Sequence, residues 1–184
     1  MKTADHEHGT IFSYALPQTL NQLLIKKDSF FVNDCYENTS LGVYYDGLWH
    51  PVCIVWGNKN GVWKLFADDV IIDSGINFQT GHVIKGGGVV IIGQHQDLFS
   101  EGDQSGFQYS QGFVGRISGM NLWDFIVPQK KILRMSQTCG VEIGNVLQWL
   151  DFETKYHGDV ILENPSSCQI PSAKQGTKKT KSNH

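Results

Sequence analysis

The sequence has few of the features that place a chain in a membrane or in a common enzyme class. It contains no run of about 18 apolar residues, so no transmembrane helix is predicted. Its first residues, MKTADHEH, hold no apolar stretch, so no signal peptide is visible. No Cys-x-x-Cys, His-Glu-x-x-His or Gly-x-Ser-x-Gly pattern occurs, and residues 86–88 (GGG) lack the Lys-Ser/Thr of a phosphate loop. We therefore predict no enzyme activity.

Charged residues are also scarce, at 18% of the 184 residues, and they are unevenly distributed. Residues 1–168 carry 11 basic and 18 acidic side chains, a net charge of −7, whereas residues 169–184 carry four Lys and no acid. An acidic body argues against nucleic-acid binding, which needs a basic face. We predict a disordered start over residues 1–8, one domain over residues 9–168 and a basic disordered tail over residues 169–184.

Proline is rare and glycine common, five residues against 20, which suits a turn-rich β fold better than a helix bundle. One short helix is predicted at residues 128–135, with Pro128 at its first position. Short apolar runs predict strands at residues 11–15, 23–25, 29–32, 49–56, 62–66, 70–72, 89–92, 113–117 and 120–123. The expected fold is all-β, an antiparallel two-sheet sandwich with one short helix.

The four cysteines leave the redox environment open. An even number is compatible with two disulfides and an oxidising compartment. Cys53, however, lies in an apolar run where a buried free thiol is equally ordinary. The triplet Asn38-Thr39-Ser40 is a glycosylation sequon and favours a secreted glycoprotein. The absence of a visible signal peptide contradicts secretion unless the true start of the chain is missing.

Two blocks of sequence carry a resemblance to a known family. Residues 86–97 read GGGVVIIGQHQD, and residues 110–124 read SQGFVGRISGMNLWD. Together they closely resemble the pentraxin domain, and residues 9–162 as a whole are similar to it, most of all to pentraxin modules of extracellular mosaic proteins and adhesion receptors. The resemblance implies a lectin-like jelly roll, calcium-dependent ligand binding, cyclic oligomers and a disulfide between Cys139 and Cys168.

The resemblance also implies that opening strands, about 40 residues before residue 9, are missing from this sequence. In the family that segment carries the partner of the cysteine that matches Cys53. Cys53 therefore either pairs with Cys35 or stays reduced.

The implied calcium site is incomplete. Carried over residue by residue, its ligands are Asn21, Gln96, Asp97, Gln108 and Gln111, with Gln96 acting through its backbone carbonyl. Leu20, His95 and Gln108 stand where the family has carboxylates, and imidazole is a poor ligand for a hard cation. Since calcium affinity follows the number of charged ligands, we expect weak or no binding. Glu101 and Asp103, in a longer loop, either restore the site or are ordinary solvated acids.

The sequence therefore favours an extracellular recognition module with a degraded calcium-dependent site. Its expected partner is an extracellular protein or a glycan- or phosphate-bearing ligand. The alternative is a structural or cell-adhesion module that works without metal, as a non-functional fragment of a larger secreted protein.

Overall fold

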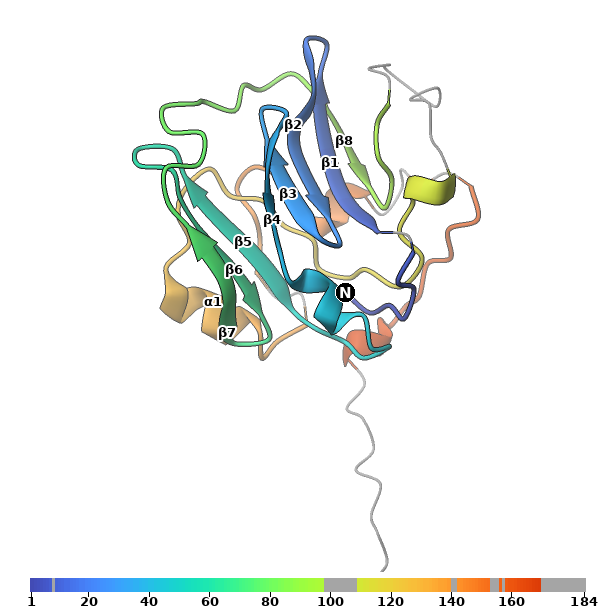
Figure 1. Ribbon diagram of the computed structural model, residues 1–184. Coiled ribbons are helices and arrows are strands. Elements are labelled where there is room, and N and C mark those ends of the chain that lie inside the picture. Colours follow the sequence, from blue (N-terminus) through green and yellow to red (C-terminus); the bar gives the residue numbers. More distant parts are fainter. Residues whose placement is uncertain (8, 98–108, 140–141, 153–155, 157, 170–184) are drawn as a thin grey trace, which may run out of the picture.

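The protein is a two-layer β-sandwich, seen in a computed structural model that describes residues 1–7, 9–97, 109–139, 142–152, 156 and 158–169 (Figure 1). One antiparallel sheet has the strand order β4-β3-β2-β1-β8, and the other has the order β5-β6-β7. The strands of the first sheet are β1 (Thr10–Leu16), β2 (Thr19–Lys26), β3 (Ser29–Val32), β4 (Cys35–Asn38) and β8 (Val89–Ile92). Those of the second are β5 (Val52–Gly57), β6 (Val62–Ala67) and β7 (Val70–Gly75).

The helical elements of the described residues are all short. The α-helix α1 covers Gln129–Met135, with Pro128 as its N-cap, one position earlier than predicted. Four single 3₁₀ turns cover Leu41–Tyr44, Tyr109–Gln111, Trp149–Phe152 and Ser167–Gln169. No helix in the described part of the chain is long and apolar enough to cross a membrane.

The main core lies between the two sheets. Phe30 of β3 is fully buried, and its ring lies 5.0 Å from that of Trp63 in β6 and 5.1 Å from that of Phe78. These edge-on aromatic contacts join the two layers. A second apolar cluster covers the other face of the three-stranded sheet, where Phe66 packs with Val127 and with Ile132 of α1. The three-stranded sheet is therefore apolar on both faces.

Tight turns set the register of the first sheet. Val32 pairs with Cys35, so Asn33 and Asp34 form a two-residue loop, and both have positive φ angles, 54° and 59°. That backbone is typical of the hairpin turn whose twist matches the flanking strands. The same turn brings Asp34 beside β2, where its carboxylate accepts hydrogen bonds from Asn21.

The structure corrects the strand prediction after β8. Residues 113–117 and 120–123 do not pair with each other; the bridges recorded for this region are Lys2 with Arg116 and Leu122 with Leu147. Gly115 explains part of the difference, because its φ is +156° and a side chain there would meet the Lys2 carbonyl at 2.4 Å. The sequence analysis also did not predict β4, which is polar and largely exposed.

The start of the chain also differs from the prediction of disorder. The Met1 amino group donates to the His50 carbonyl, and the His50 N–H donates to the Met1 carbonyl, both at 2.8 Å. Thr3 is buried, and its hydroxyl donates to the Val114 carbonyl at 2.6 Å. Backbone pairing of this kind holds a segment whose polar composition alone predicts fraying. The predicted tail lies, apart from Gln169, outside the described residues.

Candidate functional site

Three of the predicted calcium ligands meet at one end of the five-stranded sheet. Asn21 is in β2, Asp97 lies in the loop that follows β8, and Gln111 ends the 3₁₀ turn Tyr109–Gln111. Side-chain contacts link all three to His95, which lies two residues before Asp97. The fold therefore brings together residues that are far apart in the sequence.

His95 is the centre of this cluster. Its Nε2 lies 2.8 Å from Oδ1 of Asn21. Its Nδ1 lies 3.1 Å from Oδ1 of Asp97 and within hydrogen-bond distance of Oε1 of Gln111. The side chain of His95 is only 14% exposed, so protein groups supply most of its polar contacts. We refer to Asn21, His95, Asp97 and Gln111 as the His95 cluster.

The hydrogen-bond network fixes which atoms donate. Asn21 uses its amide nitrogen to donate to Asp34 at 3.0 Å, which leaves its oxygen facing His95. Gln111 uses its amide nitrogen to donate to Asp97 at 3.4 Å, which leaves its oxygen facing His95 as well. Both ring nitrogens of His95 therefore face oxygen acceptors.

Gln96 belongs to the core and not to the cluster. It is fully buried, and its amide nitrogen donates to the Ser13 carbonyl at 3.3 Å, the Ser13 hydroxyl at 3.1 Å and the Val89 carbonyl at 3.1 Å. These bonds fasten the loop after β8 to β1 and β8. The role predicted for Gln96 therefore rests on its backbone carbonyl.

The described donor set does not fit calcium. Calcium takes six to eight oxygen ligands at loops that converge on it. The cluster offers one carboxylate, Asp97, and two amide oxygens that lie against the ring nitrogens of His95. Within the described ranges, no three His, Cys, Asp or Glu side chains come close enough to share a metal ion. Gln108, Glu101 and Asp103 lie outside the described residues.

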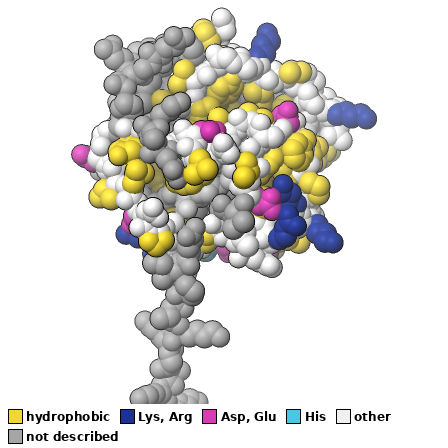
Figure 2. Space-filling model, turned by 180° about the vertical axis from the view of Figure 1, so that it is seen from behind, with side chains coloured by type: hydrophobic (Ala, Val, Ile, Leu, Met, Phe, Trp, Pro, Cys, Tyr) yellow, Lys and Arg dark blue, Asp and Glu magenta, His cyan; other side chains and the backbone are white. Residues whose placement is uncertain are grey.

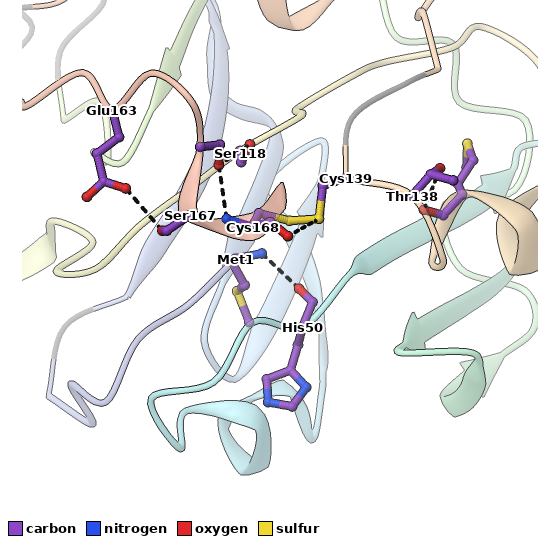
Figure 3. Close-up of a disulfide and its surroundings, with 10 residues drawn as sticks. Met1, His50, Ser118, Thr138, Cys139, Glu163, Ser167 and Cys168 are labelled. Carbon is purple, nitrogen blue, oxygen red and sulfur yellow. Dashed lines mark hydrogen bonds between the residues drawn. A yellow bond between two sulfur atoms is a disulfide. The ribbon is translucent and has the colours of Figure 1, made fainter. Parts of the chain in front are cut away.

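The disulfide implied by the resemblance is present. Cys139 and Cys168 are joined, with their Cα atoms 5.9 Å apart, and the bond connects the chain after α1 to the end of the described chain (Figure 3). The alternative pair is wrong, because Cys35 and Cys53 are both free. Cys35 is exposed at the outer strand β4, whereas Cys53 lies in β5 of the other sheet. Burial raises the pKa of the Cys53 thiol to about 11.

The predicted glycosylation site lies on the surface. Asn38 ends β4, the outer strand of the five-stranded sheet, and its side chain is exposed. An oligosaccharide attached there would need no rearrangement of the core. Glycosylation of Asn38 stays a prediction.

The sequence analysis did not single out a second histidine cluster. His50 lies between two carboxylates, with Nε2 2.9 Å from Asp46 and Nδ1 3.0 Å from Asp68. Burial acts to lower the pKa of His50, but hydrogen bonds and attraction from both carboxylates outweigh it, so the pKa is raised. In the sequence, the one sign of this cluster is that Asp46 and His50 lie four residues apart.

Comparison with known proteins agrees with this architecture. The model of the Pentaxin family matches residues 2–164. A Rattus norvegicus protein named Sushi, von Willebrand factor type A, EGF and pentraxin domain-containing protein 1 is 34% identical over 173 residues, which cover 90% of this chain and 5% of that protein. Neuronal pentraxin-2 of Mus musculus is 34% identical over 166 residues, covering 88% of this chain and 38% of that protein. This chain thus spans a small part of these relatives.

A solved structure is similar over most of the chain. The native heptameric SAP-like pentraxin from Limulus polyphemus superposes with a TM-score of 0.69 at 27% identity, covering 82% of this chain and 73% of that one. The fold is therefore the lectin-like jelly roll that the resemblance implies. Both the sequence match and the shared fold lead to one conclusion: the chain belongs to the Pentaxin family, the pentraxins.

Proposed function

We propose that this domain is an extracellular recognition module in which His95 takes the place of a bound calcium ion. The observation that carries this proposal is the placement of both ring nitrogens of His95 against the oxygens of Asn21, Gln111 and Asp97. A metal ion would need these same oxygens as ligands. A donating imidazole instead links β2 to the two loop segments without a metal.

The chemistry of the His95 cluster indicates a class of ligand. Without a metal, the site has no strong cation to bridge to a phosphate, and the charge of Asp97 faces His95. Amide groups and a partly exposed carboxylate instead suit the hydroxyls of a glycan or the polar groups of an extracellular protein. Asp97 is 26% exposed, so a ligand can reach its carboxylate.

Thermal unfolding with millimolar calcium or with a chelator tests the proposal. A ligand that binds only the folded state stabilises it, by about 2.7 kcal/mol at 100 times its Kd. We expect no calcium-dependent shift for the natural chain. His95→Glu should acquire one, because it adds a carboxylate and removes the competing donor. His95→Gln is the matched control, since it removes the ring without adding charge, and it should acquire none.

Two results would contradict the proposal. A calcium shift in the natural chain that Asp97→Asn abolishes would mean that the site binds calcium, with ligands beyond the His95 cluster. A glycan or protein ligand whose binding required calcium would mean the same. If neither calcium nor any polar ligand acts at this site, the structural or adhesion function becomes the better interpretation.

A further inference from the structure

A tyrosine on the outer strand β4 is exposed beside a glycosylation sequon. Tyr36 is 58% exposed, and it lies two residues before Asn38 of the triplet Asn38-Thr39-Ser40. Alternate residues of a β-strand share a face and lie about 7 Å apart. Tyr36 and Asn38, both in β4, therefore project side by side from the same face of the five-stranded sheet.

That face is the outer one, away from the main core. Phe30 of β3 is buried between the two sheets, against Trp63. Because side chains alternate along a strand, its neighbour Phe31 points to the opposite face of the sheet. Phe31 is paired directly with Tyr36, so Tyr36 and Asn38 share the outer face with it. An oligosaccharide on Asn38 would thus begin over this face, beside the ring of Tyr36.

Neighbouring side chains hold the ring of Tyr36 in place. The rings of Phe31 and Tyr36 have their centroids 5.3 Å apart, and their planes are tilted by 34°. Phe31 is paired on its other side with buried Leu24, and the ammonium of Lys26 lies 6.0 Å from its ring centroid. Tyr36 therefore presents the most exposed ring of this row. A ring already held by packing loses little conformational freedom when a ligand stacks on it.

The chemistry of an N-linked glycan suits this ring. Its first sugar is N-acetylglucosamine, whose ring carries C–H bonds on each face. The face of an aromatic ring is electron-rich and attracts the positively polarised hydrogens of such bonds. An Asn side chain with one sugar attached spans the distance of about 7 Å between alternate residues of a strand. A sugar on Asn38 can therefore lie flat on the ring of Tyr36 without movement of the backbone.

Exposure alone does not single out Tyr36. Figure 2 shows apolar side chains scattered among polar ones over one face of the molecule. The sequence, however, holds a single Asn-x-Ser/Thr triplet in which x is not Pro; the other such triplet begins at Asn164, which is followed by Pro165. Among the described residues, Tyr36 is thus the exposed aromatic side chain that lies two residues from an acceptor of an N-linked glycan.

We propose that Asn38 carries an N-linked glycan whose first N-acetylglucosamine stacks on the ring of Tyr36. Attachment takes place in the secretory pathway, so the inference rests on the extracellular location proposed above. An oligosaccharide carried on a lipid diphosphate supplies the sugar. Its C1 bonds to Nδ2 of Asn38, its bond to the phosphate oxygen breaks, and the amide gives up a proton.

The attached glycan also covers an open edge of the sheet. Among the described strands, β4 pairs only with β3, so its outer edge carries no neighbour. An open edge can pair with a strand of another chain, and bulky polar groups beside it prevent such pairing. A glycan that rests on Tyr36 stays close to this edge, whereas one that extends into solvent leaves it accessible.

Thermal unfolding of four proteins tests the contact between the sugar and the ring. The full chain is produced in animal cells behind a cleavable secretion signal, and an endoglycosidase trims its glycan to a single N-acetylglucosamine. Asn38→Gln gives the form without sugar, and both forms are also made with Tyr36→Thr, which keeps a strand-forming residue. The sugar should raise the melting temperature by about 2 to 4 °C when Tyr36 is present. With Tyr36→Thr the rise should stay within about 1 °C.

Two further variants are controls. Phe125→Thr removes another exposed aromatic side chain, before α1, and should leave the effect of the sugar unchanged. Tyr36→Phe keeps the ring and should keep the rise in melting temperature. Proton NMR gives a readout that does not depend on stability. The ring current should move the C–H resonances of the sugar upfield with Tyr36 or Tyr36→Phe, and not with Tyr36→Thr.

Two results would overturn the inference. Equal rises with Tyr36 and with Tyr36→Thr, or sugar resonances that Tyr36→Thr leaves in place, would mean that the sugar acts without the ring. A secreted chain that carries no glycan on Asn38, as measured by mass spectrometry, would remove its basis. Neither result involves calcium or the His95 cluster. The calcium experiment described above therefore separates failure of this inference from failure of the proposed function.

Discussion

The disulfide between Cys139 and Cys168 should stabilise the domain substantially, because the described contacts of the segment that it closes are mostly hydrogen bonds and ion pairs at the surface. Leu122 and Leu147 form one short bridge there. An ion pair joins Arg116 to Glu163 at 3.2 Å, with the two side chains 51% and 38% exposed. Surface pairs of this kind typically contribute less than about 1 kcal/mol. Replacement of both cysteines by alanine should therefore reveal most of the effect of the covalent link.

The expected magnitude follows from loop closure. The two cysteines are 29 residues apart in the sequence. Cross-linking a loop of this length lowers the entropy of the unfolded chain and corresponds to about 3.5 kcal/mol at 25 °C. For a domain of this size, each kcal/mol shifts the melting temperature by about 2 to 4 °C. The double variant Cys139→Ala/Cys168→Ala should thus melt about 7 to 14 °C lower.

Urea unfolding followed by tryptophan fluorescence, together with a thermal scan, measures this loss. Cys35→Ala is the control, because Cys35 is exposed and unpaired, and it should leave both values unchanged within about 0.5 kcal/mol. A loss below about 1 kcal/mol in the double variant would refute the reasoning. It would mean that the segment after Cys139 opens without unfolding the sandwich, so that the link lowers the entropy of the folded and unfolded states alike.

Three further predictions concern single side chains. Gln96→Ala should destabilise the domain by about 2 to 4 kcal/mol, because it leaves a cavity and unpaired carbonyls. Gln96→Met fills the cavity and should lower the free energy of unfolding by less; urea unfolding compares the two variants. His50 has a raised pKa in the folded state, so its contribution is present below its unfolded value near 6.5 and is lost as pH rises through the folded value. The stability difference between the natural chain and His50→Gln should therefore be larger at pH 6 than at pH 8.5. Burial lowers the pKa of the Met1 amine to about 6, but this group titrates in both proteins and so does not contribute to the difference. With a pKa of about 11, roughly one Cys53 thiol in a thousand is ionised at pH 8. A thiol reagent should therefore modify exposed Cys35 quickly and Cys53 slowly, and equal rates would contradict the burial of Cys53.

The sequence predicted most of the strands because their signals are local. The runs around β1, β6 and β8 alternate or stay apolar between turn residues, and the fold places them as expected. The prediction failed at residues 113–123 because their apolar pattern is interrupted by Gly115 and Gly119, whose positive φ angles direct the chain to partners elsewhere. Partners so distant in sequence leave no local signal. The bridge between Leu122 and Leu147 is one such case.

The sequence named residues that the fold brings together, but not the way in which they contact one another. The family resemblance named Asn21, Asp97 and Gln111, and the fold brings them together. It treated His95 only as a lost carboxylate. The role proposed for His95 depends on which way the Asn21 amide points, and Asp34 sets that direction from a turn with positive φ. No property of the sequence near His95 reports the position of that turn.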